Sequence, residues 1–196
     1  RFPGRERALG VAYSPDGRLL AATLHPRSRS TAGLWWSKVG LWSVASHRRI
    51  EDLDAPPTPS ARPSAREGVS RLAFSPDRRT LAAAGTRGAV LWDVRRKRRL
   101  APPALGGATK DVAFGPGGRL LAMAERNGAV KLWDIGARAI VRTPRSRGES
   151  VNAVAVAHGG QLMAWGDDDG RVSVWDRRSG RTTSSVVRGP IPRIWS

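Results

Sequence analysis

The acidic run Asp167-Asp168-Asp169 is the strongest candidate in this sequence for metal chemistry, because carboxylates stand side by side there. A calcium loop needs further oxygen ligands at defined spacing, and none follows the run. The run leads instead into Gly170, and aspartate is favoured in tight turns because it hydrogen-bonds to nearby backbone. The three histidines are His25, His47 and His158. They lie too far apart in the sequence to show the spacing of metal ligands. The sequence therefore predicts a turn here and no metal site.

Other patterns associated with catalysis are incomplete. The sequence GGATK at 106–110 contains only part of a phosphate-binding loop and leads into a strand-like pattern rather than a helix. The chain has no cysteine, which excludes disulfides and thiolate ligands. No nucleophile and base stand out as a pair that a cleft could hold. We therefore expect no enzyme, no catalytic residue and no cofactor.

The charge of the chain is strongly positive. It carries 34 basic and 16 acidic residues, a formal net charge of +18, and most of the basic residues are arginine. Such a surface attracts polyanions, although the codon usage of a GC-rich genome also enriches arginine. Five cations are adjacent, at Arg95, Arg96, Lys97, Arg98 and Arg99. No aromatic residue is interleaved to stack bases, so a solvated turn is favoured over a polyanion site.

Membrane and export signals are absent from the sequence read here. No apolar run approaches the roughly 18 residues that would span a bilayer, and Arg1 to Gly10 contains no apolar block typical of a signal peptide. We expect a cytoplasmic protein without a transmembrane segment.

An internal repeat organises the chain. Four similar segments begin at Leu9, Val69, Thr109 and Ser150. Trp92, Trp133 and Trp175 follow one another at spacings of 41 and 42 residues. This period is typical of repeats that form one small sheet each.

Each segment predicts four short antiparallel strands. Apolar residues alternate in the first run, as at Leu72 and Phe74, and the turn Ser14 to Gly17 has the proline, aspartate and glycine of a tight turn. A second apolar run, another glycine turn and a third run ending in tryptophan follow. One such sheet cannot bury both faces alone. The sheets are therefore expected to stack, with the tryptophans between them.

These residues make the chain resemble the WD40 repeat family of β-propellers. The Trp-Asp pair of the family stands in three segments, and the phrases SPDGRLLA from Ser14 and DDGRVSVWD from Asp168 are similar to its two hairpins. Residues expected to be structural on this resemblance are Trp42, Trp92, Asp93, Trp133, Asp134, Asp169, Trp175 and Asp176. The resemblance implies an all-β fold of four consecutive four-stranded antiparallel blades, forming an incomplete or open ring.

The blades depart from the family pattern. No histidine follows a glycine before a first strand, so the Asp–His–Ser–Trp hydrogen-bond network of the family is incomplete. Asp169 stands at the expected aspartate position, whereas Asn127 and Arg87 occupy or neighbour it in two other blades. Trp42-Ser43 replaces Trp-Asp in the first blade. Divergent, bacterial-type blades stabilised by tryptophan and aliphatic packing are expected.

The spacing sets the blade boundaries. We expect blade 1 at about 8–54 with an insertion at 25–38, a linker loop at 54–67, blade 2 at about 68–105, blade 3 at about 108–146, blade 4 at about 149–188, and the start of a further strand at 189–196. Propellers need about four to eight blades to close. The chain is expected to be a fragment of a longer propeller, with a second copy completing the ring as the alternative.

A protein-docking patch is predicted where blade 1 breaks the period. Tyr13 to Trp42 spans 29 residues, against 18 for Phe74 to Trp92. In an antiparallel blade the insertion and the linker emerge at the same end. Tryptophan and arginine dominate binding hot spots, and the candidate residues are Trp35, Trp36, Arg27, Arg29, Arg62 and Arg66. The alternative is that the tryptophans extend the third strand and pack inward, beside a spacer loop.

The function expected from the resemblance is a scaffold that binds a protein partner or regulates a sibling domain of a longer chain. Bacterial proteins resembling this one often carry such propellers after a kinase or a signalling NTPase domain. The alternative is nucleic-acid or polyanion binding through the arginine-rich surface.

Overall fold

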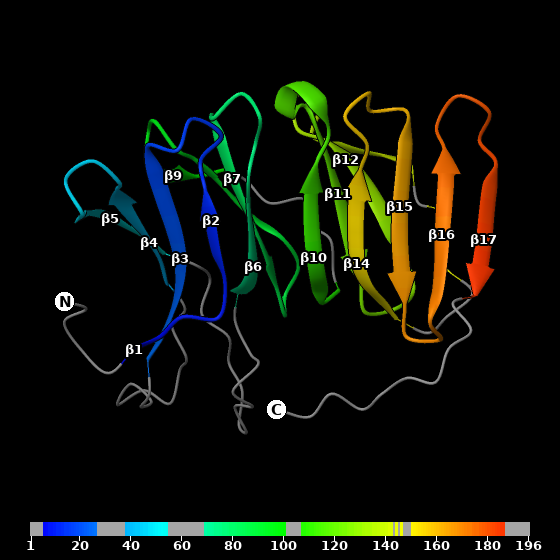
Figure 1. The fold of residues 1–196 in the computed structure, drawn as a ribbon, viewed down its shortest axis with the longest axis horizontal. Coiled ribbons are helices and arrows are strands. Elements are labelled where there is room, and N and C mark those ends of the chain that lie inside the picture. Colours follow the sequence, from blue (N-terminus) through cyan, green and yellow to red (C-terminus); the bar gives the residue numbers. More distant parts are fainter. Residues whose placement is uncertain are drawn as a thin grey trace.

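A computed structural model gives the fold as four consecutive antiparallel sheets (Figure 1). The structure describes residues 6–26, 38–54, 69–100, 107–142, 144, 146 and 150–186. The first sheet contains β1 (Glu6–Arg7), β2 (Val11–Tyr13), β3 (Leu19–Pro26), β4 (Lys38–Ser43) and β5 (Arg48–Asp54). The second contains β6 (Val69–Phe74), β7 (Thr80–Gly85), β8 (Val90–Asp93) and β9 (Arg98–Arg99).

The last two sheets repeat the same order. The third contains β10 (Thr109–Phe114), β11 (Leu120–Glu125), β12 (Val130–Asp134) and β13 (Ala139–Arg142), with a single 3₁₀ turn, η1 (Pro116–Gly118), between its first two strands. The fourth contains β14 (Val151–Val156), β15 (Leu162–Asp167), β16 (Arg171–Asp176) and β17 (Thr182–Val186). From β2 onward each strand within a sheet pairs with the next along the chain, and the described elements confirm the all-β prediction.

Tryptophan packing joins neighbouring sheets. Trp92 of the second sheet is 1% exposed and packs in one cluster with Leu41 and Leu53 of the first. Trp133 likewise packs against the second sheet and Trp175 against the third. Successive side chains of a strand point to opposite faces, so each middle sheet offers its tryptophan to one neighbour and small or aliphatic residues to the other. Each internal interface is therefore built the same way.

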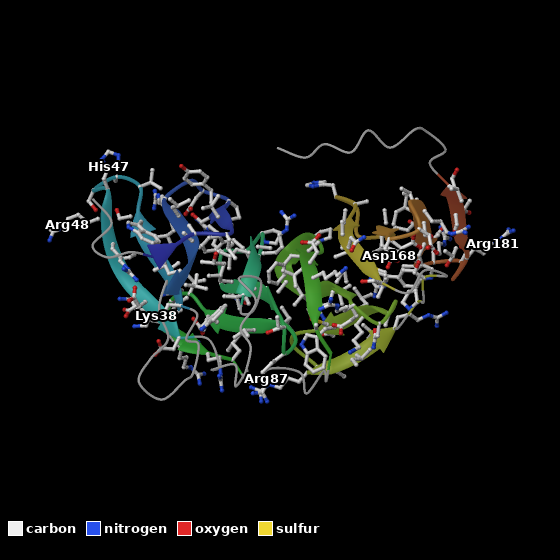
Figure 2. The ribbon with its side chains drawn as sticks, turned by 90° about the horizontal axis from the view of Figure 1, so that it is seen from below. Lys38, His47, Arg48, Arg87, Asp168 and Arg181 are labelled. Atoms are coloured by element: carbon white, nitrogen blue, oxygen red, sulfur yellow. The ribbon has the colours of Figure 1, made fainter. Side chains whose placement is uncertain are left out.

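The sheets fan out in an arc (Figure 2). Their first strands touch one another, since β6 contacts β2 and β10 contacts both β6 and β14, whereas contacts between the last strands are sparser. The sheets thus converge along their first strands. The arc does not close into a ring, which agrees with the expected open arrangement.

The start of the chain differs from the prediction. The first repeat is predicted to begin at Leu9, but Glu6–Arg7 forms β1 and pairs with His25 and Pro26. The second strand, β3, therefore runs through the first two positions of the expected insertion at 25–38. A two-residue strand carries too short a pattern to be read from sequence. The remainder of that insertion, most of the linker and the expected further strand at 189–196 lie outside the described residues.

The two outer faces of the stack are more exposed than the internal ones. Val174 occupies the register position of Leu91 and Leu132, which are 2% and 4% exposed, yet it is 38% exposed. On the first sheet, Tyr13 occupies the position of Phe74 and is 64% exposed against 8%. Both faces show the composition of an internal interface without the neighbouring sheet.

Candidate functional site

The turns that connect the first strand of each sheet to the second, and the third to the fourth, lie at one end of the stack, at the top of Figure 1. Second strands end and third strands begin at the other end, where fourth strands also end and the first strands of the following sheets begin. We call these the hairpin end and the linker end. This arrangement follows the alternation expected for antiparallel sheets.

The aspartates of the Trp-Asp pairs hold the turns between third and fourth strands. The Asp93 carboxylate accepts a hydrogen bond from the backbone N–H of Arg96 at 2.8 Å, and Asp134 accepts one from Ala137 at 2.9 Å. Asp176 accepts one from Arg178 at 2.7 Å. In the first sheet the Ser43 hydroxyl takes this place, accepting from Ser46 at 3.3 Å. Trp42-Ser43 therefore keeps the turn function with a weaker acceptor.

The turns between first and second strands of neighbouring sheets touch one another. In the first, the Ser14 hydroxyl donates to Asp16 at 2.6 Å and accepts from the backbone of Leu19. The Asp16 carboxylate also pairs with Arg78 of the second sheet at 3.2 Å. Gly118 of the third sheet lies so close to Asp77 that an added Cβ would come within 2.8 Å of its carboxylate. These contacts fix the relative position of the turns.

Hydrogen bonds lower the pKa of these aspartates. The Ser14 hydroxyl, followed by backbone and arginine contacts, lowers the pKa of Asp16 from 3.8 to about 2. The backbone N–H groups of the turns are the largest cause of the lowered pKa at three further positions: Asp93, Asp134 and Asp176. Each hydrogen bond favours the charged carboxylate. The hairpin end is therefore held by ionised aspartates.

The protein is expected to lose stability as the pH falls from about 4 to about 2. A carboxyl group whose pKa is lower in the folded than in the unfolded state stabilises the fold above its unfolded pKa, and this contribution disappears as pH falls through the folded pKa. Asp16→Asn should lower the melting temperature at neutral pH, and the difference from wild type should vanish near pH 2. The control is Asp169→Asn, the same charge change at an exposed aspartate. An Asp16→Asn deficit that persists at pH 2 would contradict this role.

The five adjacent cations lie at the hairpin end of the second sheet, and all are exposed. Arg96 pairs with Asp93 at 2.9 Å, and Lys97 pairs with Glu51 of the neighbouring sheet at 3.0 Å. For Arg95, Arg98 and Arg99 the described part of the chain shows no ion pair. The run therefore combines two cations held in place with three that face solvent.

The linker end holds the acidic turn after β15. Asp167 is buried and accepts hydrogen bonds from the Ser146 hydroxyl and the backbone of Arg171. Asp168 accepts from the backbone N–H of Ser150 at 3.1 Å, whereas Asp169 is exposed. Turn formation therefore uses Asp167 and Asp168, and the side chain aligned with the family aspartate faces solvent. Among the described residues no group of acidic or histidine side chains is arranged to hold a metal ion.

Sequence reasoning missed one polar cluster at the linker end. Glu125, fully buried at the end of β11, accepts a hydrogen bond from the Thr109 hydroxyl at 2.9 Å and lies 3.5 Å from the Lys131 ammonium. Gly107 packs directly over the carboxylate. Buried acidic residues are rare unless paired, but the sequence alone did not place Lys131 beside Glu125. The signal was a glutamate at the end of an otherwise apolar strand.

The predicted docking residues lie outside the described residues: Arg27, Arg29, Trp35, Trp36, Arg62 and Arg66. The strands that flank them are described. At the linker end β3 ends and β4 begins, and β5 ends and β6 begins there as well (Figure 1). The two segments therefore attach at the same end of the stack. No helix among the described residues is long and apolar enough to cross a membrane.

Comparison with known proteins identifies the class of repeat. The WD40 family model (WD domain, G-beta repeat) matches residues 61–93, 106–134 and 140–176, about half of the chain. The chain therefore belongs to the WD40 repeat family. The target of rapamycin complex subunit wat1 of Schizosaccharomyces pombe (strain 972 / ATCC 24843) is 36% identical over 77 residues, which cover 38% of this chain and 24% of that protein.

Solved structures show the same fold at low sequence identity. The structure of U3-55K matches with a TM-score of 0.71 at 19% identity, over 93% of this chain and 52% of that one. The RRP9 WD40 repeats match with a TM-score of 0.72 at 18% identity, over 93% and 52%. The mitotic checkpoint complex matches with a TM-score of 0.73 at 20% identity, over 91% and 51%. The chain thus spans about half the length of these structures.

Proposed function

We propose that this WD40 chain is a scaffold that binds a protein partner through its linker end. The observation that carries the proposal is the attachment of both long connections to the same end of a stack whose sheets are joined by buried tryptophans. Binding residues concentrate on long loops that a rigid scaffold positions. The names of two matches support the class of function, since one is a complex subunit and another is a checkpoint complex.

The partner-binding residues proposed here are those between β3 and β4 and between β5 and β6. Trp35 and Trp36 supply large apolar surfaces, and Arg27, Arg29, Arg62 and Arg66 supply charge-assisted hydrogen bonds. The partner class we propose is a separate protein or a sibling domain of kinase or NTPase type. We further propose a cytoplasmic location and a role without catalysis. The comparisons lend no support to nucleic-acid or polyanion binding through the arginine surface, which stays a prediction.

Replacing Trp35 and Trp36 together with alanine should remove partner binding and leave the fold intact. The change takes away the proposed apolar contact while keeping the tryptophans that join the sheets. Affinity purification from cells of the source organism, with wild type and the double variant compared by quantitative mass spectrometry, measures the loss. The melting temperature of both proteins is the control. A variant that melts at a much lower temperature would show instead that these tryptophans pack inward.

We also propose that further sheets of the same kind cover the two outer faces of the stack. The exposed Val174 and Tyr13 positions support this, because their counterparts in the internal interfaces are buried or partly buried. The covering sheets come from the remaining blades of a longer chain or from a second copy. Sedimentation over a range of concentrations separates the two sources. A strictly monomeric chain would contradict the second copy.

A further inference from the structure

The outermost strand of the second sheet has an unusual composition. β9 consists only of Arg98 and Arg99, and both side chains are exposed. The corresponding strands of the other sheets are β5, β13 and β17. Of these, only β5 also has two adjacent arginines, Arg48 and Arg49, at its start. In β5, however, Arg49 stacks over Trp42 at 5.4 Å and pairs with Asp52 at 2.5 Å.

The cations around β9 divide into fixed and unpaired ones. Arg96 and Lys97 are held by the Asp93 and Glu51 carboxylates, which fixes the turn before β9 and ties it to the first sheet. Arg95, Arg98 and Arg99 show no ion pair within the described residues. Arg95 lies in the turn before β9, and we call Arg98 and Arg99 the β9 arginines. The nearby carboxylates of Asp93 and Glu51 are already paired with Arg96 and Lys97.

The backbone of β9 is the second observation. Within the described part of the chain β9 pairs only with β8, through Trp92 with Arg99 and Asp93 with Arg98. Its other edge is the end of the sheet. An edge strand presents backbone N–H and C=O groups that another extended chain can pair with. The β9 arginines therefore stand along an edge that offers both backbone groups and positive charge.

From this juxtaposition we infer that β9 binds an extended acidic segment of a protein, which adds as a strand to the edge of the second sheet. The backbone of the segment pairs with β9, and its carboxylates accept hydrogen bonds from the β9 arginines. The inference rests on the proposed scaffold function and adds to it a second surface, at the hairpin end, with a stated partner chemistry.

The geometry favours a protein segment over a nucleic acid. A peptide backbone matches the donors and acceptors of a strand edge, whereas a phosphate chain has no donors to offer the C=O groups. Guanidinium and carboxylate groups form strong paired hydrogen bonds.

Binding of a synthetic peptide built from repeated Glu-Glu-Thr-Thr units tests the inference. Arg98 and Arg99 are adjacent in β9, so their side chains point to opposite faces of the sheet, and this peptide places carboxylates on both faces of an added strand. The peptide has the charge and the extended preference of the proposed segment. We expect Arg98→Ala/Arg99→Ala to raise the Kd for this peptide about tenfold, because two charge-assisted contacts are lost on an exposed surface. The matched control is Arg177→Ala/Arg178→Ala, which removes the same charge from exposed positions in the corresponding turn of the fourth sheet. Fluorescence anisotropy at fixed salt measures all three proteins.

Two further probes separate strand addition from general attraction. A peptide of repeated Glu-Glu-Pro-Pro units keeps the charge but lacks half of the backbone N–H groups along each edge, and it should bind more weakly than the threonine peptide. An oligothymidine of equal charge should lose the same affinity in the β9 variant and in the control variant, because both lose two exposed positive charges. Equal loss of the threonine peptide in both double variants, equal binding of the two peptides, or an oligothymidine loss larger in the β9 variant than in the control would each overturn the inference.

The outcome stays separate from that of the proposed function. If the chain captures its partner through Trp35 and Trp36 while the acidic peptide binds without regard to the β9 arginines, only the present inference fails. If no partner is captured but the peptide result holds, the linker-end proposal fails and the β9 surface stands alone.

Discussion

Replacing Trp92 with alanine is expected to lower the free energy of unfolding by about 3–5 kcal/mol. The indole is 1% exposed and lies between the first two sheets, where its N–H also donates to the Asp54 carbonyl at 3.3 Å. Removing it leaves a cavity that neighbouring strands cannot close, since their backbone is fixed by pairing. Urea denaturation followed by circular dichroism measures the change.

The matched control for this prediction is Trp42→Ala in the first sheet. Trp42 stands at the same register position but faces outward, half-buried under Arg49 rather than under another sheet. Its removal should therefore cost less than that of Trp92. Equal losses in the free energy of unfolding for the two variants would show that tryptophan stabilises the protein by packing within its own sheet and not between sheets.

The sequence was sufficient to predict the sheets because the signals repeat. The period of Trp92, Trp133 and Trp175 predicted consecutive sheets that stack with the tryptophans between them, and the structure confirms this arrangement. The alternation of antiparallel strands also placed the turns between first and second strands, and between third and fourth strands, at the same end. These features depend on local turn chemistry and on a pattern of two residues, which are visible in one chain.

Contacts between sheets could not be read from the sequence. Lys97 meets Glu51 because two outer strands of neighbouring sheets approach each other there, and no local pattern encodes that approach. Asp169 illustrates another limit. The family alignment selected it, yet the turn uses Asp167 and Asp168, because in a run of three aspartates the backbone geometry decides which side chain turns inward.

The buried Glu125 and Lys131 pair gives the second large expected effect. Replacing Lys131 with methionine should destabilise the protein by about 3–5 kcal/mol, because removing one partner of a buried pair leaves the other charge uncompensated. Glu125 is fully buried at the interface of the second and third sheets, and the Lys131 side chain is 14% exposed. Chemical denaturation at neutral pH measures the loss.

A second substitution at Glu125 separates the loss of the pair from the loss of packing. Glutamine there keeps an oxygen that can accept from the Thr109 hydroxyl, as Glu125 does now at 2.9 Å, but it carries no charge. The double variant Lys131→Met/Glu125→Gln should therefore recover most of the stability lost in Lys131→Met, since a buried ion pair contributes little compared with well-packed neutral groups. If the double variant is as unstable as the single one, the cost lies in the packing of the lysine stem and not in the uncompensated carboxylate. Recovery would mean that Lys131 is needed at this interface chiefly because Glu125 is there.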